Sequence, residues 1–513
     1  MTTERPETVP DLDWSPERAR ELGEGVLDVW TEWLGRLRDL PVARTDTAGE
    51  VGAGVAIDIP DEPLPTADLL GYLRRLTFEH SMYPGHPGFV AYVSGAGTVP
   101  GAAADLLAAG LNQNVGGWRL SPGATEIERR LTRWFADRFG FPDTAGGLMT
   151  SGGAMASFAA LKAARDLTAG GDVRREGIRG GPPLTMYGST EVHTVNARAA
   201  DMLGLGTSAF RQIPTDGDYR MRVDLLREAI ERDLASGARP VAVVGSAGTV
   251  ATGAIDPLDD LADVCAEHGL WLHLDGAYGA VASWVDDLRP LFRGIERADS
   301  IAFDPHKWLY TPHSGGALVV RDARHLSDAF SVHPSYVRED KELTGRGEDF
   351  LNHGPQFSRG FQALKVWVSL LAHGWNAYAR RIAHDARLAA YLHERAAAHP
   401  DFEVVAPQSL SIACFRYVPP DLRTDAKDRG NEVVQAYMDA LNERLMAAVQ
   451  MDGRVYPSNA VLDGRFVLRA CIVNFRTEAE DMDALLEVTS RLGARIDEEM
   501  RPEELRPGRR AEA

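Results

Sequence analysis

Cysteine is scarce in this chain, and long apolar runs are absent. Cys265, Cys414 and Cys471 are widely spaced and form no Cys-x-x-Cys pair, which argues against a disulfide framework or a zinc site and favours a reducing compartment. No run of about 18 apolar residues is available to span a bilayer, and MTTERPETVPDLDW lacks the basic and then apolar pattern of a signal peptide. We therefore expect a cytoplasmic protein that makes no membrane contact.

Basic residues are in the minority, with 55 Lys and Arg against 74 Asp and Glu and a formal net charge of −19. Proteins that bind the phosphate backbone usually carry a basic stripe, so this balance argues against a nucleic-acid partner. A solvated acidic surface explains the charge more simply. With 513 residues, 44% of them hydrophobic, the chain is long enough for two or three domains around a large core.

The pattern along the chain divides it into three parts. Residues 1–98 form a helical and irregular lead-in, where Ser15 precedes Pro16 as the N-cap of a predicted helix. Residues 99–372 alternate apolar runs with helical patterns, as in PVAVVGSAG, DPLDDLADVCAEHG and LWLHLDGAYGA, which predicts an α/β domain with a parallel sheet. Residues 373–513 begin with a long helical pattern and continue with separated strands, which predicts a smaller α+β C-terminal domain.

Ligands of parallel α/β sheets bind at the carboxyl ends of the strands, so the residues that follow each strand are the candidates for chemistry. In GGLMTSGGAMASF, a Ser-Gly-Gly turn runs into a helix whose free N–H groups favour a phosphate, although such a turn is often only local turn chemistry. In LWLHLDGAYGA, Asp275 closes an apolar strand. That carboxylate would either stabilise a buried cation, such as a protonated pyridine nitrogen, or cap a helix.

Lys307 follows a third strand end, in ADSIAFDPHKWL. A lysine among apolar groups loses its proton more readily, and the neutral amine attacks an aldehyde to form a Schiff base. The alternative is a lysine that packs its stem and extends its amine to water. The order along the chain, a phosphate turn, then an acid and then a lysine at successive strand ends, favours a site for pyridoxal phosphate.

At these residues the chain resembles the group II pyridoxal-phosphate-dependent amino acid decarboxylases. DSIAFDPHKWL is similar to the Schiff-base signature of that family, and the likeness runs from about residue 86 to residue 477. The resemblance implies a type I aminotransferase-like fold, in which a mainly parallel central sheet has helices on both faces. It also implies pyridoxal 5′-phosphate as the cofactor, an amino acid as the small-molecule substrate, and a homodimer with active sites at the interface.

The resemblance assigns roles by position. Lys307 would carry the cofactor as a Schiff base, Asp275 would pair with its pyridinium nitrogen, and His193 would stack on its ring. Arg359 would receive the substrate carboxylate, and Tyr336, in a stretch similar to the family's mobile catalytic loop, would return a proton to the substrate Cα. The other positions implied to contact the cofactor are Ser151, Gly153, Ala154, Thr249, Ala277, Asp304 and His306. No metal ligand is implied.

Several positions depart from the pattern of the family. Ala154 stands where a hydroxyl residue is common, so one phosphate hydrogen bond is expected to be absent or to come from Ser151. Met155 replaces a common acidic residue, while Gly276 and Asp304 stand where the aromatic enzymes usually have alanine and asparagine. These changes indicate a divergent, bacterial-type branch.

The substrate pocket is implied by four positions. Tyr92 and Trp118 align with pocket-lining residues and suit a flat aromatic side chain. Val93 replaces a bulkier aromatic and opens space beside them. Ser358 stands where a hydroxyl residue accompanies phenolic substrates in related plant enzymes, so we expect tyrosine or dopa ahead of tryptophan.

Three functions remain open. Decarboxylation of an aromatic L-amino acid to the amine and carbon dioxide is favoured. Oxygen-dependent decarboxylation and deamination to an aldehyde, or transamination, uses the same cofactor; related enzymes with phenylalanine in place of Tyr336 tend to form the aldehyde, so Tyr336 favours simple decarboxylation. The third is a non-catalytic interaction protein that holds the cofactor, and the complete set of catalytic residues argues against it.

Overall fold

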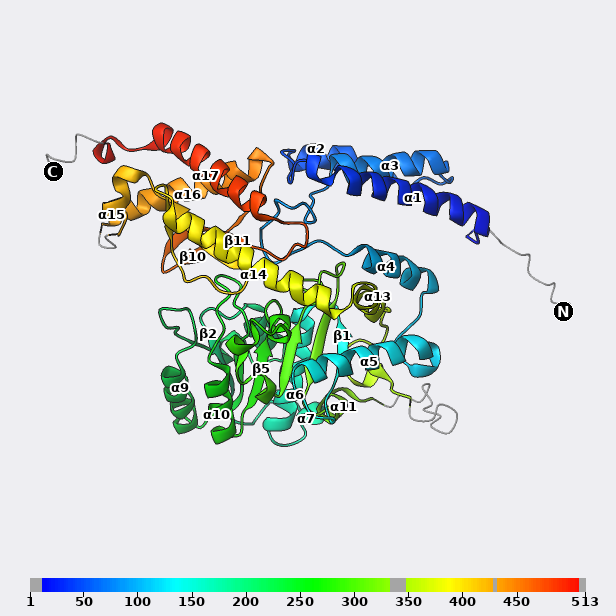
Figure 1. Ribbon diagram of the computed structural model, residues 1–513. Helices are drawn as coiled ribbons and strands as arrows, with labels where there is room; N and C mark the ends of the chain where they lie inside the picture. The colour runs from blue at the N-terminus through cyan, green and yellow to red at the C-terminus, as the bar shows by residue number, and fades with distance from the viewer. Residues whose placement is uncertain (1–11, 333–346, 428–430, 507–513) are drawn as a thin grey trace.

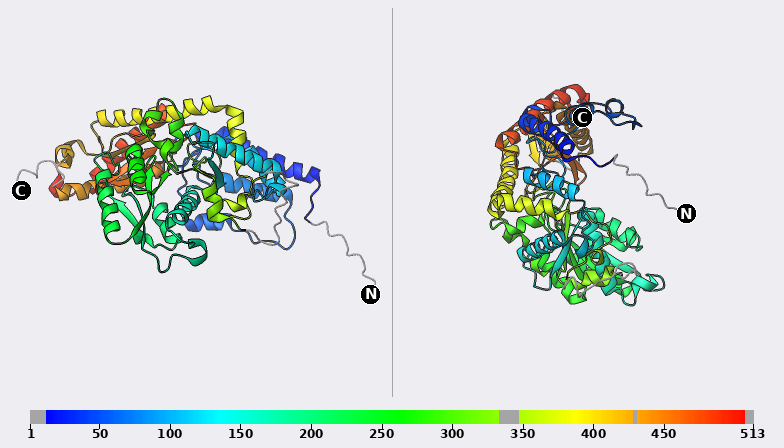
Figure 2. Two further views of the ribbon diagram at one scale, coloured as in Figure 1. Left: turned by 90° about the horizontal axis from the view of Figure 1, so that it is seen from below. Right: turned by 90° about the vertical axis from the view of Figure 1, so that its right-hand side faces the viewer.

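The computed structural model of the protein describes residues 12–332, 347–427 and 431–506. A seven-stranded sheet with its helices forms one part of the molecule (Figure 1). The C-terminal region and the N-terminal helices lie together on one side of that part, and the same arrangement is seen from the right-hand side in Figure 2.

The N-terminal helices form an outlying layer. They are α1 Pro16–Arg36, α2 Ala48–Val55 and α3 Thr66–Glu79, followed by α4 Val99–Leu111. Ser15 caps α1 as predicted, because its hydroxyl accepts a hydrogen bond of 3.3 Å from the backbone N–H of Arg18. An ion pair between Arg74 and Glu32 joins α3 to α1. No residue of α1, α2 or α3 is buried in the described chain, so this layer has little core of its own.

The central sheet confirms the expected α/β architecture. Its strands are β1 Gly146–Thr150, β2 Leu184–Ser189, β3 Phe210–Ile213, β4 Arg239–Ser246, β5 Trp271–Asp275, β6 Ser300–Phe303 and β7 Gly316–Val320. They lie in the order β1-β7-β6-β5-β4-β2-β3. Strand β7 is antiparallel to both of its neighbours, and the other strands run parallel to one another.

Helices cover both faces of this sheet. They are α5 Pro122–Arg138, α6 Gly153–Thr168, α7 Val173–Glu176, α8 Val195–Met202, α9 Val223–Ala235, α10 Leu258–His268, α11 Arg324–Phe330 and α13 Ala363–His373. The chain crosses the sheet in one direction through α6 and α8 and returns through α9 and α10. Because such crossovers are right-handed, opposite directions place the two pairs of helices on opposite faces.

The C-terminal region is a smaller α+β unit, as predicted. Its helices are α14 Trp375–Ala398, α15 Arg423–Lys427, α16 Glu432–Asp452 and α17 Ala479–Met500. Its strands β8 Phe402–Val404, β9 Ile412–Tyr417, β10 Ser458–Leu462 and β11 Arg465–Cys471 form an antiparallel sheet in the order β10-β11-β9-β8. The boundaries at residues 98 and 372 stay predictions.

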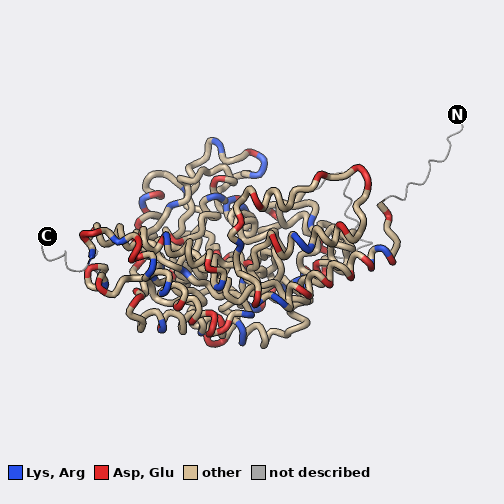
Figure 3. The backbone as a smooth tube through the Cα atoms, turned by 90° about the horizontal axis from the view of Figure 1, so that it is seen from above, with Lys and Arg blue, Asp and Glu red and all other residues tan. Residues whose placement is uncertain are grey.

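The surface and the cysteines complete the description. Lys and Arg lie interspersed with Asp and Glu along the backbone (Figure 3). All three cysteines are buried free thiols. Within the described ranges, no helix has the length and apolar character needed to cross a membrane.

Candidate active site

The ends of neighbouring parallel strands bring the predicted cofactor residues to one edge of the central sheet. Ser151 and Gly153 follow β1, and His193 follows β2. Thr249 follows β4, Asp275 is the last residue of β5, and Lys307 follows β6. The carboxyl ends of parallel strands share an edge, which is why residues so far apart in sequence meet here.

Asp275 is held in one orientation by two donors. The side-chain amide of Asn196, from the first turn of α8, donates a 2.7 Å hydrogen bond to its Oδ2. The backbone N–H of Ala277 donates to its Oδ1 at 3.2 Å. The carboxylate is buried, and each of its oxygens accepts a hydrogen bond. Such a group can hold a proton on a ligand nitrogen placed against it.

His193 lies in the turn between β2 and α8, and its Nδ1 accepts a 3.2 Å hydrogen bond from the backbone N–H of Val195. That bond places the proton of the neutral ring on Nε2. Removal of water lowers the pKa of His193, although Asp275 acts in the opposite direction, and Lys307 lowers it further. The imidazole is therefore neutral near pH 7, as suits a ring that stacks on a flat cofactor.

Lys307 lies directly against a carboxylate. Its Nζ is 3.0 Å from Asp304 Oδ2, while the Lys307 side chain is 19% exposed and that of Asp304 is 5% exposed. The other carboxylate oxygen, Asp304 Oδ1, is buried and has no hydrogen-bond partner among the described residues. His306 lies beside this pair, with its Nε2 3.9 Å from Asp304 Oδ2, and burial lowers its pKa. Asp304 thus binds the lysine amine through one oxygen and has no partner for the other among the described residues.

The start of α6, which follows β1, packs against the turn that carries Asp304 and Lys307. A Cβ at Gly153 would lie 3.0 Å from Asp304 Oδ2 and 3.3 Å from the Cβ of Ala277, so the helix end approaches the lysine turn more closely than a side chain allows. The first backbone N–H groups of a helix have no partner within it and attract a phosphate. Ser151 and Ala154 are exposed beside this helix start, while the buried Thr249 bonds to Thr252 Oγ1 at 3.0 Å.

These residues fit pyridoxal phosphate. A bare helix start for the phosphate, a carboxylate for the ring nitrogen, a neutral imidazole and a lysine converge on one edge, where the buried Asp304 Oδ1 also lacks a hydrogen-bond partner among the described residues. No group of three or more His, Cys, Asp or Glu in the described ranges is arranged to hold a metal ion.

Trp118 and Arg359 were predicted to bind the substrate, and their contacts are with residues other than Asp275, His193 and Lys307. Trp118 begins the short helix η2 Trp118–Leu120 and donates from Nε1 to Glu126 Oε1 at 3.2 Å. The Arg359 guanidinium is buried, pairs with Glu128 and donates to Met149 O at 2.7 Å. Ser358, beside it, is exposed. The guanidinium of Arg359 is already bound to Glu128 and to the Met149 carbonyl. The role of Arg359 as receiver of the substrate carboxylate therefore stays a prediction, and these contacts do not support it.

Tyr92 contacts an arginine, Arg469, that the sequence analysis did not single out. Arg469, on β11, donates from Nη1 to Tyr92 O at 2.7 Å and from Nε to Ala251 O at 3.2 Å. Its Nη2 is buried and has no hydrogen-bond partner among the described residues. An arginine inside the apolar run RFVLRACIVNF is the sequence signal that would have found it. Arg469 thus competes with Arg359 as the receiver of a carboxylate.

One predicted residue lies outside the described part of the structure, and one residue of the site was not predicted. Tyr336 lies outside the described residues, so its place in the site stays a prediction. Asn196, the amide that orients Asp275, was not predicted, although it follows His193 by three residues. An asparagine near a helix start is usually read as a cap, which is why the sequence alone did not single it out.

Comparisons with known proteins agree with this geometry. The family described as "Pyridoxal-dependent decarboxylase conserved domain" matches residues 50–418. An aromatic-L-amino-acid decarboxylase from Bacillus atrophaeus is 34% identical over 473 residues, which cover 92% of this chain and 95% of that protein. A phenylacetaldehyde synthase from a Rosa hybrid cultivar is 28% identical over 471 residues, 90% of this chain and 91% of that protein.

A solved structure extends the likeness to the fold. Oryza sativa TDC, solved with PLP and tryptamine, has a TM-score of 0.87 and 26% sequence identity, with 95% of this chain and 100% of that chain covered. The predicted fold and family are confirmed. The family model and the Bacillus relative each cover most of the chain, and the protein belongs to the group II pyridoxal-phosphate-dependent decarboxylases, enzymes of the carboxy-lyase class.

Proposed function

We propose that this enzyme decarboxylates an aromatic L-amino acid to the corresponding amine, with Lys307 as the covalent anchor of the cofactor. The observation that carries the proposal is the placement of Lys307 Nζ 3.0 Å from Asp304 at the strand edge that also holds Asp275 and His193. The aromatic preference draws on Trp118 and Tyr92 and on the name of the Bacillus relative. Tyrosine or dopa is proposed ahead of tryptophan, on the basis of Ser358.

Each residue has a defined task in this reaction. Bound pyridoxal phosphate supplies the electron sink for the pair of electrons left when carbon dioxide departs. Asp275, fixed by Asn196, holds a proton on the ring nitrogen and so favours that electron flow. The neutral imidazole of His193 would stack on the ring. Lys307 would hold the cofactor covalently between turnovers, and Tyr336 is proposed to return the proton to Cα.

A second reaction has specific support. Phenylacetaldehyde synthases occur among the relatives, and a Rhodiola rosea 4-hydroxyphenylacetaldehyde synthase structure has a TM-score of 0.81 at 25% identity over 95% of this chain. Oxygen-dependent decarboxylation and deamination is therefore the alternative. Transamination on the same cofactor is a further alternative, revealed by a requirement for a keto acid.

One experiment separates these reactions. Purified enzyme with pyridoxal phosphate is given a panel of L-amino acids while carbon dioxide release and dissolved oxygen are followed together. We expect carbon dioxide release with tyrosine or dopa as the best substrate and no loss of oxygen. Oxygen loss in step with carbon dioxide would establish the aldehyde-forming reaction, and turnover of tryptophan but not tyrosine would overturn the substrate assignment.

The enzyme is further proposed to work as a homodimer with its active sites at the interface, and to be cytoplasmic. The described chain exposes Leu106, Leu107 and Leu111 on α4, and the layer α1–α3 buries none of its residues. A contiguous apolar face of this kind usually marks a protein interface. Packing of α4 against a second copy of the chain would bury this apolar face.

A further inference from the structure

Asp385, on α14, is a fully buried carboxylate that belongs to none of the predicted site residues. Its Oδ2 accepts hydrogen bonds from Trp308 Nε1 at 3.0 Å and from Tyr310 Oη at 2.7 Å. Its Oδ1 accepts from Arg381 Nε at 2.9 Å. Two of these three donors therefore belong to residues that lie one and three positions after Lys307.

The backbone turn that carries Lys307 depends on the same two residues. The backbone N–H of Tyr310 donates to the carbonyl of Lys307 at 3.2 Å, which closes the turn. Tyr310 has a φ of 51°, in the left-handed region that a bulky residue rarely adopts without outside support. Trp308 is fully buried and stacks on Tyr278, with 4.9 Å between ring centroids. Side chains thus hold this turn from both sides.

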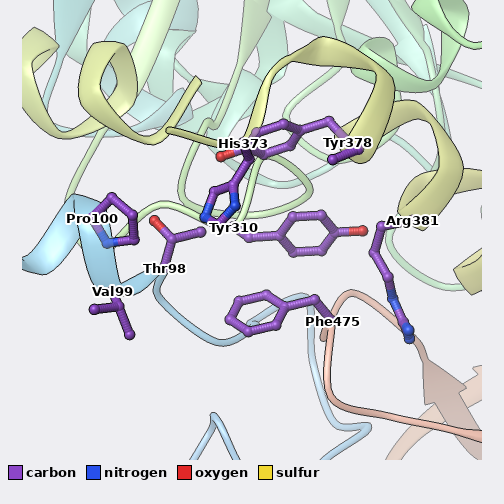
Figure 4. A pocket seen from close by; sticks show the side chains of 9 residues that line it. Thr98, Val99, Pro100, Tyr310, His373, Tyr378, Arg381 and Phe475 are labelled. Atoms are coloured by element: carbon purple, nitrogen blue, oxygen red, sulfur yellow. The ribbon is translucent and has the colours of Figure 1, made fainter. Parts of the chain in front are cut away.

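The Tyr310 ring is buried beside a cavity. This cavity of about 260 Å³ is lined also by Tyr378, Phe475 and the start of α4. Figure 4 shows the Tyr310 ring between Tyr378 and Phe475, with its hydroxyl directed toward Arg381. The ring centroids are 6.1 Å and 5.6 Å away. The hydrogen bond to Asp385 adds a directional restraint to the packing around the ring.

Arg381 connects this carboxylate to the C-terminal region. Its Nη1 donates to Glu478 Oε1 at 3.0 Å, and its Nη2 donates to Thr477 O at 2.6 Å. Burial raises the pKa of Asp385 to about 7 although Arg381 opposes the rise. A buried ion pair is often no more stabilising than apolar packing, so orientation of the groups around it explains its presence better than stability does.

We propose that Asp385 is a positioning residue for Lys307: by fixing Trp308 and Tyr310, it sets the turn that presents the lysine amine to the cofactor. The proposal rests on the proposed role of Lys307 as the anchor. Asp385 acts on the amine through the turn, and Arg381 couples the turn to the chain that follows β11.

The test compares Tyr310→Phe and Asp385→Asn with Tyr378→Phe as the matched control. Tyr378→Phe removes a hydroxyl from the same cavity, and that hydroxyl does not bond to Asp385. For each variant, the melting temperature of the cofactor-free protein is measured. At equal cofactor occupancy, the rate at which borohydride traps the cofactor on the protein is measured next, followed by kcat and KM with the best amino acid.

We expect Tyr310→Phe to lower kcat about three- to tenfold and Asp385→Asn about 10- to 100-fold, with slower trapping and a nearly unchanged KM, because misplacement of a reacting group lowers the rate rather than binding. The double variant should lose no more than Asp385→Asn alone, since both changes act on one contact. Tyr378→Phe should match the wild-type enzyme in trapping and kcat. If Asp385→Asn does not fold, Tyr310→Phe and its control still decide the outcome.

Two results would count against different claims. Wild-type trapping and kcat in Tyr310→Phe, with only a lower melting temperature, would overturn the positioning role. Trapping that persists at the wild-type rate in Lys307→Ala would instead overturn the proposed anchor, whatever the Asp385 variants do.

Discussion

At the scale of single residues, the chemistry of the site depends on a few charged groups whose partners are defined. Asp275 has a donor on each oxygen, and Lys307 has a carboxylate at 3.0 Å. The pKa of His193 is lowered mainly by loss of water. Hydrogen bonds thus orient the carboxylate, whereas desolvation favours the neutral imidazole.

Replacement of Asp275 tests the role of its carboxylate. Asp275→Asn keeps the shape but removes the charge that holds a proton on the ring nitrogen, so we expect kcat to fall at least about 100-fold. Asn196→Ala removes one hydrogen bond to that carboxylate, about 1–2 kcal/mol, and should cost about tenfold. Steady-state kinetics with cofactor content measured in parallel gives both values. Equal losses in the two variants would contradict the separate roles.

At the scale of elements, the close approach of α6 to the lysine turn decides how a phosphate is received. The helix begins at Gly153, where a Cβ would lie 3.0 Å from Asp304 Oδ2. A side chain there would push the helix start away from Asp304 and from the Lys307 amine beside it. The glycine is needed at this position for space, since its φ is not in the left-handed region.

The substitution Gly153→Ala tests that approach. We expect about a tenfold weaker affinity for pyridoxal phosphate, because the added methyl must displace Asp304 or the first turn of α6. Gly123→Ala, in the first turn of α5 with no atom within 4 Å of the added Cβ, is the matched control and should leave affinity unchanged. Cofactor titration followed by absorbance measures both. Wild-type affinity in Gly153→Ala would show that the helix start does not hold the phosphate.

At the scale of the whole molecule, the exposed face of α4 and the outlying N-terminal helices suggest that the described chain is one half of an assembly. Leu106 is 76% exposed and Leu107 is 57% exposed. A net charge of −19 would oppose loose association, so a stable dimer needs apolar contact of this kind. Function is expected to depend on it if the active site lies at the interface.

A single charge on α4 tests the assembly. Leu107→Glu would bury an unpaired carboxylate in the proposed interface, so we expect dissociation into monomers and at least a tenfold loss of activity. Leu234→Glu, on α9 at a leucine that is 48% exposed, is the control and should remain dimeric and active. Light scattering after size exclusion gives the mass of each variant. A monomeric wild-type enzyme with full activity would refute the proposal.

The fold was predictable because its signals are local. Strand and helix patterns are recognised within about a dozen residues. Parallel strands bring their carboxyl ends to one edge of the sheet, regardless of the conformation of the loops. That geometry explains why Asp275 and Lys307 were singled out as candidates, whereas His193 was assigned only through the resemblance to the family. The antiparallel direction of β7 was not predicted, because a short apolar run does not show which way it will run.

The sequence by itself determined the class of fold, the family and the residues at the strand ends, since each lies in a short motif whose chemistry is local. Only the tertiary structure decided the partners: Arg359 with Glu128, Arg469 with Tyr92, and Asp385 with Trp308 and Tyr310. The physical reason is distance along the chain. Asp385 lies 75 residues from Tyr310 and 77 from Trp308, and no local pattern specifies which distant buried donor will meet a buried carboxylate.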